Sequence, residues 1–485
     1  MNKNKSLKKN FMYNFSLNII NILFPLITAP YISRVLGANN LGKYNFSLSF
    51  SNWFLIFATF GTTTYGVREI AKARDNKKLL NKTFSEIFSI NFIATLITLL
   101  VYIAVIFINP KTNGEISLFL VSALSLFLNL FCIDWFYAGL EDFKIITLRS
   151  LLIKLICLVS IFIFIRQKND YVIYALISVL AFGMANIFNF IYSRKFVKLT
   201  FKNIDIKHHI KKISIFFYSN IVVSIYTVFD QVILGFLSTN KDVAFYSRSK
   251  QIYSIALSIT LSISTVLLPK LSYLCKNDFE SYKKLLKKSI NYIYIFSVPS
   301  VLGLMILAKD IMWFFGGKEF ESAFMSLVIL SVLVFTVSLG TWQYDQLFVP
   351  LGREKIGLKS QIFMAVVSIG SNIILIPKFG YIGASFSFVF AEITGTVYAV
   401  YYAKKKINEV RIKYLTKSLV NYIFSSLIMT FIIVGFKFLK FGYIINIIFG
   451  VFMGPIVYFG MLYLIKDDIC KEFVNYLMKK LKKQM

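Results

Sequence analysis

The sequence predicts an all-α integral membrane protein with about fourteen transmembrane helices. Hydrophobic residues make up 57% of the 485 residues, whereas a water-soluble protein of this length needs far more polar surface. Windows of about 20 mainly apolar residues, enough to cross the hydrocarbon core of a bilayer, recur from Phe11 to Ile465 with short polar breaks. Basic residues gather in alternate breaks, which is the third observation behind this fold class.

The apolar windows define the expected elements in order. We expect spans at residues 11–33, 45–67, 87–109, 115–137, 147–165, 171–193, 213–237, 246–268, 289–308, 323–346, 358–376, 381–402, 416–438 and 442–465. The first window follows a lysine-rich start, as a signal peptide would. It is too long for one, contains Pro25 and Pro30, and has no small-residue cleavage site, so we interpret it as the first helix.

The distribution of Lys and Arg supports this count. With the N-terminus in the cytoplasm, 40 of the 54 basic residues fall in segments on the cytoplasmic side, 13 fall outside, and Lys154 lies within a span. This is the asymmetry of the positive-inside rule, and a miscounted helix would scramble it. Both termini are therefore predicted to be cytoplasmic. Topology and attraction to anionic lipid account for the net charge of +31, so no nucleic-acid partner is expected.

No pattern indicates a metal site, a disulfide or a cofactor. The four cysteines show no metal-ligand spacing. His208 and His209 are adjacent in a basic cytoplasmic segment, where we expect a solvated loop.

An internal repeat divides the chain. The segment "DWFYAGLEDFKIITLRS" from Asp134 matches "DQLFVPLGREKIGLKS" from Asp345, and downstream the offset stays at 210 residues. A weaker match pairs Tyr44 with Tyr246. The repeat relates spans one to six to spans seven to twelve with the same orientation, which predicts two six-helix lobes around a central cavity. We expect lobes at 1–210 and 211–410, and two further helices with a basic tail at 411–485.

Three charged residues lie well inside predicted spans: Lys154, Asp230 and Glu392. Because a charge at mid-bilayer costs about 2.5–3.5 kcal/mol on insertion scales, such residues face a partner or a polar cavity. Two interpretations stay open. The charges pair with one another to hold helices together, or they line a pathway for ions or a charged substrate. By the 202-residue offset, Asp230 corresponds to Thr28, so the repeat itself does not require an acid.

Other candidates lie at the ends of spans. Arg34, Arg68, Arg248 and Lys250 are either interface anchors or part of a substrate site, and the matched Asp134 and Asp345 have an interfacial or structural role at the cytoplasmic side. Pro25 and Pro30, in "LFPLITAP", make span one the expected bending element, and a bend in a helix that lines a cavity is one way to gate access.

Four segments resemble a known family. "APYISRVLGANNLGKYNFSLSF" from Ala29, "DWFYAGLEDFKIITLRSLLIKLI" from Asp134, "DQVILGFLSTNKDVAFYSRSKQIY" from Asp230 and "NIILIPKFGYIGASFSFVFAE" from Asn372 are similar to Wzx-type oligosaccharide flippases. These form the polysaccharide transporter branch of the multidrug, oligosaccharidyl-lipid and polysaccharide (MOP) exporter superfamily.

The resemblance implies a multi-pass protein of the bacterial cytoplasmic membrane. Such a protein moves undecaprenyl-diphosphate-linked oligosaccharide repeat units to the outer leaflet by alternating access. Arg34 and Asp230 carry over from the family motifs, while basic residues vary in the family at Arg248 and Lys250. Lys154 and Glu392 rest on their position in a span alone. Asp230 and Glu392 are candidates for binding a coupling H⁺ or Na⁺.

Further expectations concern partners and rival functions. We expect function as a monomer, alongside a polysaccharide polymerase and glycosyltransferases. One alternative is a multidrug or small-molecule exporter of the same superfamily. A membrane glycosyltransferase or polymerase is a weaker alternative, because the longest external break is about 15 residues and carries no paired-acid or histidine motif.

Overall fold

The computed structural model describes residues 7–200, 204–407, 409–410 and 412–472, and these residues form helices without a strand. Two compact units divide the chain, Met1–Ala244 and Phe245–Met485. Nine helical stretches of the described part are long and apolar enough to cross a membrane, and the bent pair α9 and α10 makes a tenth. An all-α membrane fold is therefore confirmed, whereas the count of fourteen and the lobe boundary at residue 210 stay predictions.

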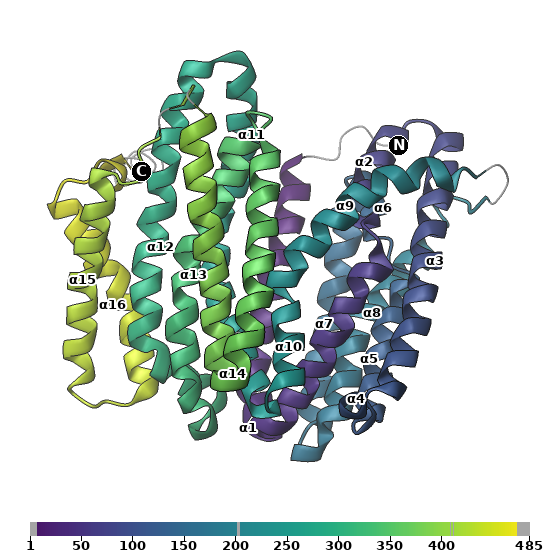
Figure 1. The fold of residues 1–485 in the computed structure, drawn as a ribbon, viewed down its shortest axis with the longest axis horizontal. Coiled ribbons are helices and arrows are strands. Elements are labelled where there is room, and N and C mark those ends of the chain that lie inside the picture. Colours follow the sequence, from purple (N-terminus) through teal and green to yellow (C-terminus); the bar gives the residue numbers. More distant parts are fainter. Residues whose placement is uncertain (1–6, 201–203, 408, 411, 473–485) are drawn as a thin grey trace, which may run out of the picture. The chain divides into compact units, whose positions relative to one another are not determined.

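The first unit consists of helices that pack around α1 (Figure 1). Its elements are α1 (Leu7–Thr59), α2 (Thr62–Ala73), α3 (Lys77–Ile108), α4 (Pro110–Asn113), α5 (Ile116–Asn129), α6 (Asp134–Gly139), α7 (Phe143–Phe164), η1 (Lys168–Asp170), α8 (Tyr171–Ser193), α9 (Ile206–Thr227), α10 (Phe229–Leu237) and the start of α11 (Asn240–Asn277).

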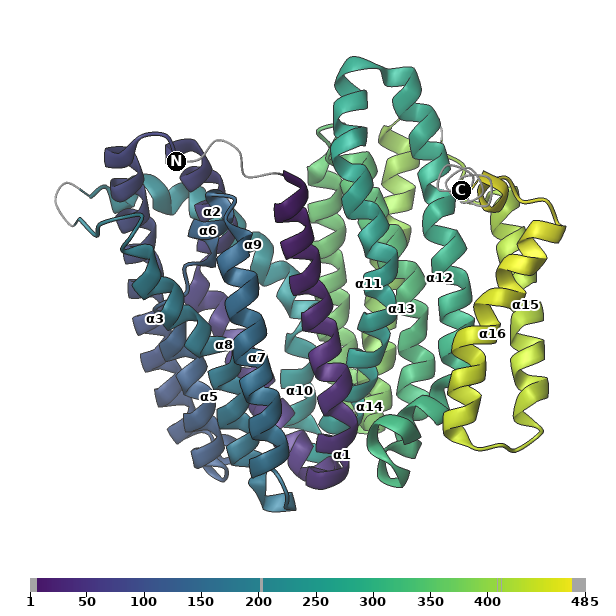
Figure 2. The ribbon, with the colours of Figure 1, turned by 180° about the vertical axis from the view of Figure 1, so that it is seen from behind.

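Helix α1 contains both of the first two predicted spans. It reverses direction at Gly37, whose φ of 72° is a left-handed conformation that glycine adopts without strain, and Figure 2 shows its two purple legs meeting at the labelled turn. Tyr31 Oη donates to the carbonyl of Ile165 at 2.6 Å and Asn40 Nδ2 donates to that of Lys168 at 2.7 Å. Both legs are thus tied to the C-terminal end of α7. The gap between the predicted spans 11–33 and 45–67 is helical apart from Gly37, so the polar break expected there is not a loop.

The second predicted span is too long. It ends at Thr59, and the left-handed residues Phe60 and Gly61, with φ of 46° and 75°, separate it from α2. The predicted end at residue 67 is wrong because α2 is an amphipathic helix of its own. Its polar side carries Arg68, which therefore does not lie at the end of a span.

The second unit is built on α12 (Figures 1 and 2). Its elements are the rest of α11, then α12 (Phe279–Gly316), η2 (Lys318–Ala323), α13 (Phe324–Trp342), the π-helix η3 (Gln343–Phe348), α14 (Glu354–Lys406), α15 (Lys417–Lys437) and α16 (Tyr443–Leu464). Helix α14 holds two predicted spans, which meet at Gly380 with φ 53°.

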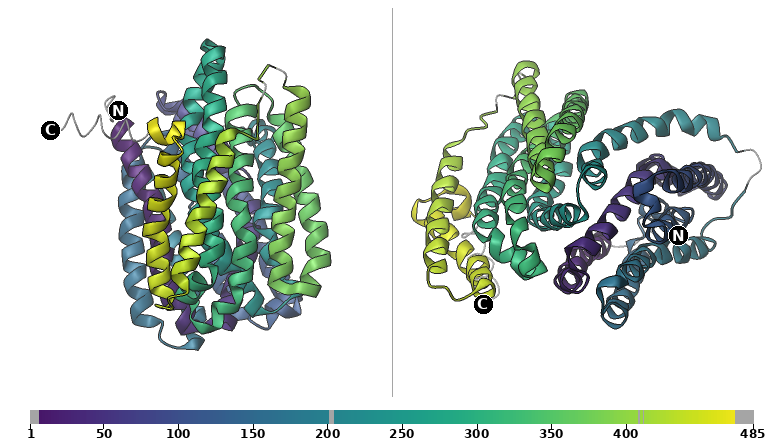
Figure 3. Two further views of the ribbon diagram at one scale, coloured as in Figure 1. Left: turned by 90° about the vertical axis from the view of Figure 1, so that its left-hand side faces the viewer. Right: turned by 60° about the horizontal axis from the view of Figure 1, so that its bottom comes forward.

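The last two helices form a hairpin that packs against α12, and Figure 3 shows this yellow pair side by side. A buried polar cluster fixes it. Lys437 Nζ donates to Asp310 Oδ2 at 2.6 Å, and Asn446 Nδ2 donates to Asp310 Oδ1 at 2.8 Å. One carboxylate of α12 thus joins α15 and α16, where the repeat offers no partner.

Candidate functional site

Asp230 lies directly after a break in a membrane span. Helices α9 and α10 meet at an angle of 46°, and Val228 between them leaves the helical conformation with φ −126° and ψ −42°. Asp230 falls in the first turn of α10 and is fully buried. Its Oδ1 accepts a hydrogen bond from Gln231 N at 2.7 Å. A helix N-terminus favours a carboxylate, because its N–H groups and dipole point towards it.

The repeat position in the first half has different geometry. Thr28 is also buried, at 3% exposure, but its hydroxyl donates to the carbonyl of Phe24 at 3.0 Å within an unbroken stretch of α1. The helix likewise continues through Pro25 and Pro30, and the non-helical residue in α1 is Gly37. Asp230 therefore occurs together with the helix break at Val228, and the matching position in the first half, Thr28, has neither an acid nor a break.

Lys154 lies on α7 and is 7% exposed. Its ammonium faces the rings of Phe24 and Phe182, 6.0 and 5.6 Å from their centres. Cation–π contact with rings from two helices is one way to hold a charge inside a membrane protein.

Arg34 lies near the Gly37 turn, exposed, with Nη1 donating to the carbonyl of Pro30 at 3.2 Å. Arg68 on α2 is bound differently. Its Nε contacts Glu69 Oε1 at 3.1 Å, and its guanidinium lies over the rings of Tyr65 and Phe216. Burial alone raises the pKa of Glu69, but hydrogen bonds from Lys72 and Arg68 outweigh it and lower the pKa below its ordinary value.

In the second unit, Lys250 and Glu392 lie in one neighbourhood. The Lys250 ammonium is 5.0 Å from the ring centre of Phe388 and 5.3 Å from that of Tyr246. Phe388 and Glu392 share a face of α14, one turn apart. Glu392 is 5% exposed, and within the described part of the chain no hydrogen bond or ion pair to its carboxylate is found. Lys250 thus lies against α14, with its ammonium over a ring one turn from Glu392.

Arg248 lies on the same helix, two residues before Lys250. It is 7% exposed, and Nη1 donates to Gln251 Oε1. At 1.5 Å per residue, Lys250 lies about 15 Å along α11 from its start at Asn240, and Glu392 about 17 Å along α14 from Tyr381. Half of a hydrocarbon core about 30 Å thick is about 15 Å, so these are the distances of a mid-bilayer residue when Asn240 and Tyr381 lie at the membrane surface.

The matched aspartates both lie where helix geometry changes. Asp134 opens α6 after the break that follows α5, and Asp345 lies in the π-helix η3. Asn189 donates to Asp134 Oδ1, and Arg149 Nη2 lies 4.0 Å from it. Arg149 was expected only as a topological charge, yet its Nε and Nη1 are buried without a hydrogen-bond partner. A basic residue inside the predicted span 147–165 was the signal for it.

Two further polar clusters were not predicted. The expectation of a solvated loop is wrong for His209, which is 7% exposed on α9. Its Nδ1 lies 2.7 Å from Tyr65 Oη and its Nε2 lies 2.9 Å from Glu86 Oε2. Burial raises the pKa of Tyr65 to about 12. This cluster joins α9 to α2 and α3. The other is the Asp310 cluster described above.

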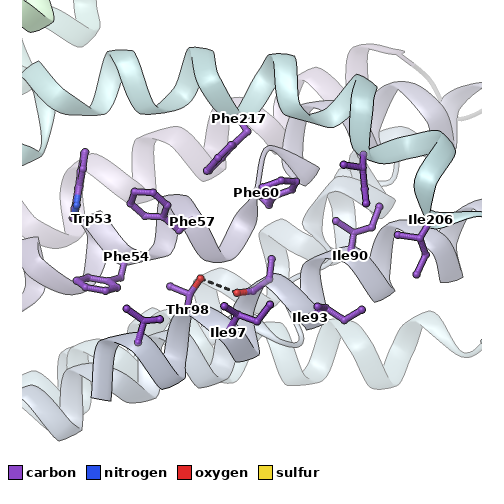
Figure 4. Close-up of a pocket in the computed structure, with 13 residues that line it drawn as sticks. Trp53, Phe54, Phe57, Phe60, Ile90, Ile93, Ile97, Thr98, Ile206 and Phe217 are labelled. Carbon is purple, nitrogen blue, oxygen red and sulfur yellow. Dashed lines mark hydrogen bonds between the residues drawn. The ribbon is translucent and has the colours of Figure 1, made fainter. Parts of the chain in front are cut away.

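An apolar cavity of about 600 Å³ lies within the first unit. Figure 4 shows its walls from α1, α3 and α9. They are Trp53, Phe54, Phe57, Phe60, Ile90, Ile93, Ala94, Ile97, Thr98, Val101, Ile206, Ile210 and Phe217. The hydroxyl of Thr98 donates to the carbonyl of Ala94 at 2.7 Å, so the one hydroxyl of the lining is used within its own helix.

Solved structures of transporters share this fold. A lipid II flippase MurJ in an inward closed conformation aligns with a TM-score of 0.75 at 18% identity, covering 95% of this chain and 99% of that one. An inward-facing multidrug resistance MATE family transporter of the MOP superfamily aligns with a TM-score of 0.62 at 16% identity, covering 82% and 99%. The chain therefore has the fold of MOP transporters.

Sequence comparison gives the family. A putative O-antigen transporter of Escherichia coli is 26% identical over 81% of this chain and 95% of its own length. The capsular polysaccharide biosynthesis protein CapF of Staphylococcus aureus is 24% identical over 82% and 99%. The family model described as polysaccharide biosynthesis protein matches residues 7–275. Because this match spans more than half of the chain, the chain belongs to the polysaccharide biosynthesis protein family.

Proposed function

We propose that the protein moves polyprenyl-diphosphate-linked oligosaccharide from the cytoplasmic to the outer leaflet for the synthesis of a surface polysaccharide. Its relatives carry names of transporters and of polysaccharide biosynthesis, and a solved structure of its fold is a lipid II flippase. The observation that carries the proposal is the set of charged side chains buried at membrane depth, of which Asp230 at 0% and Glu392 at 5% exposure are the clearest. Such charges mark substrate or ion pathways.

The chemistry of the cargo fits these residues. A diphosphate and a hydrophilic glycan need a polar path through hydrocarbon, while the polyprenyl tail stays in lipid. Arg34, Arg248 and Lys250 supply cations that a diphosphate can bind. Asp230 in the first unit and Glu392 in the second each hold a cation of their own unit in place, or bind the H⁺ or Na⁺ whose gradient resets the transporter. Alternating access is the transport mode of transporters built from two parallel repeats, and we propose it for this protein.

The setting of the protein is also part of the proposal. The excess of basic residues in alternate segments supports cytoplasmic termini, and the bacterial relatives support the cytoplasmic membrane. We propose that the protein acts as a monomer and passes its cargo between glycosyltransferases and a polymerase.

A multidrug or small-molecule exporter is the second candidate, since a MATE transporter shares the fold. Deletion of the gene distinguishes the two. Loss of a flippase leads to intracellular lipid-linked repeat units and loss of the surface polysaccharide, whereas loss of a drug exporter leads to drug sensitivity with the polysaccharide intact.

The direct test is Asp230→Asn, expressed in the deletion strain. The amide keeps the size of the side chain and removes its charge, so we expect at least a tenfold loss of surface polysaccharide with unchanged protein in the membrane. Asp75→Asn is the matched control, because Asp75 is exposed in the turn before α3. Full export by the Asp230 variant would refute a role for this acid in transport.

A further inference from the structure

The apolar cavity of the first unit has the dimensions of a slot for one hydrocarbon chain. Along α3 it extends from Ile90 to Val101, which is about 17 Å at 1.5 Å per residue. One leaflet contributes about half of a hydrocarbon core roughly 30 Å thick. By the predicted topology, Phe60 and Ile206 lie at its cytoplasmic end. The slot therefore spans the depth of the cytoplasmic leaflet.

The walls of the slot are apolar on three sides. Aromatic rings of α1 form one wall, with Trp53 against Phe57 at 5.6 Å between ring centres. Phe217 of α9 extends this wall and packs against Phe60, with ring centres 4.5 Å apart (Figure 4). The α3 wall is open to lipid, because Ile93 and Ile97 are 49% and 59% exposed. A chain can thus enter sideways from the bilayer.

The cytoplasmic end of the slot carries basic residues. Lys207 and Lys211 are exposed beside the lining residues Ile206 and Ile210 on α9. Arg68 lies with its guanidinium 5.5 Å from the ring centre of Phe216, next to the lining residue Phe217. The acids nearby are already engaged: Glu69 by Arg68 and Lys72, Glu86 by His209, and Asp205 as the cap that accepts from His208 N at the start of α9. An apolar slot that ends at cations at the membrane surface complements a lipid with an anionic head.

The wall formed by α9 is fixed in place. His209 bridges Tyr65 of α2 and Glu86 of α3, as described above, and Glu86 Oε1 also accepts from Asp205 N at 2.7 Å. These contacts hold the first turn of α9 at the cytoplasmic end of α3. The slot is therefore a formed feature of this unit and needs no ligand to separate its walls.

We propose that this slot binds the polyprenyl chain of a polyprenyl phosphate lipid, with the phosphate at Lys207, Lys211 and Arg68. Walls on three sides admit one chain, which suits a single isoprenoid chain better than the two chains of a diacyl lipid. The choice of an isoprenoid rests on the proposed function. The slot would collect the tail of the cargo in the cytoplasmic leaflet, before its head enters the translocation path.

The test uses the purified full chain in nanodiscs of phosphatidylcholine and a polyprenyl phosphate with a photoreactive diazirine on the chain. We expect labelled peptides from residues 53–60, 90–101 and 206–217. Ala94→Trp fills the slot and should lower this labelling at least fivefold. Leu100→Trp is the matched control, since Leu100 is 68% exposed on the same helix and does not line the slot; its labelling should equal that of wild type.

Competition on the wild-type protein tests the choice of ligand without any variant. Unlabelled polyprenyl phosphate should displace the probe, and tenfold more dioleoylphosphatidylglycerol should not. Equal displacement by the diacyl lipid, or labelling that Ala94→Trp leaves unchanged, overturns the proposal. The assay contains no glycan, so slot labelling by a protein that fails to move oligosaccharide would overturn the proposed function and leave the slot intact.

Discussion

The buried Asp310–Lys437 pair gives a prediction whose size follows from the structure. Asp310 is 2% exposed and the Lys437 side chain 28%, and they join α12 to α15. Lys437→Met keeps most of the side-chain volume and leaves a buried carboxylate with Asn446 as its remaining described donor. Removing one partner of a buried pair costs about 3–5 kcal/mol. Because water reaches Lys437, we expect a cost nearer to about 2 kcal/mol in the free energy of unfolding.

The double variant Asp310→Asn with Lys437→Met is the control. The amide still accepts from Asn446, and no charge is left buried, so most of the loss should be recovered. Thermal unfolding in detergent can be followed with a thiol-reactive dye, since Cys157 and Cys470 are buried. For a loss of about 2 kcal/mol we expect a melting temperature roughly 2–4 °C lower. Equal melting temperatures of the single and double variants would show that Lys437 does not act by neutralising this carboxylate.

Three further changes test packing and the site. Gly42→Ala should lower the free energy of unfolding by about 1–3 kcal/mol, because the new Cβ would lie 1.7 Å from the carbonyl oxygen of Asn240. Gly303→Ala is the control, since its Cβ meets nothing within 4 Å and its melting temperature should equal or exceed that of wild type. Equal loss in both variants would contradict this reasoning. His209→Phe leaves two buried polar groups without their partner and should cost about 2–4 kcal/mol, measured by the same dye, and an unchanged melting temperature would argue against the cluster. Glu392→Gln should lower glycan export in the deletion strain at unchanged melting temperature, and full export would exclude a role for this acid in transport.

Hydrophobic pattern and charge asymmetry were sufficient to predict the fold class and the positions of most helices, because both follow directly from the bilayer. They could not locate the turns. Gly37 and Gly380 reverse the chain within a residue, so helix replaces the polar loops that the pattern suggests. The hydrophobic pattern also hid α2, because Tyr65 and Val67 of this helix extend the apolar window of the preceding span although the left-handed pair Phe60 and Gly61 breaks the helix.

The sequence predicted part of the candidate site, because local patterns show single residues but not contacts between distant segments. A lone charge in an apolar window, such as Lys154 or Glu392, is visible in the sequence, and the structure finds both buried. Pairs from distant segments are not visible. His209 and Glu86 are 123 positions apart and Asp310 and Lys437 are 127 apart, and each residue by itself resembles an ordinary loop or interface charge.

The helices on either side of the break before Asp230, α9 and α10, are both held by contacts with the rest of the first unit. Lys111 Nζ donates to the carbonyls of Gly235 and Phe236, both at 2.8 Å, at the end of α10, which satisfies acceptors that a helix C-terminus leaves open. A Cβ at Gly235 would lie 2.0 Å from the ring of Phe46, so α10 packs closely on α1. His209 fixes the other end of the pair. With both ends tied to the same unit, the non-helical residue Val228 is the break between them, two residues before Asp230. A change in the bend at this residue would therefore move the carboxylate of Asp230. This geometry is the reason why we propose that the acid senses cargo or ion and does not merely tie two helices together.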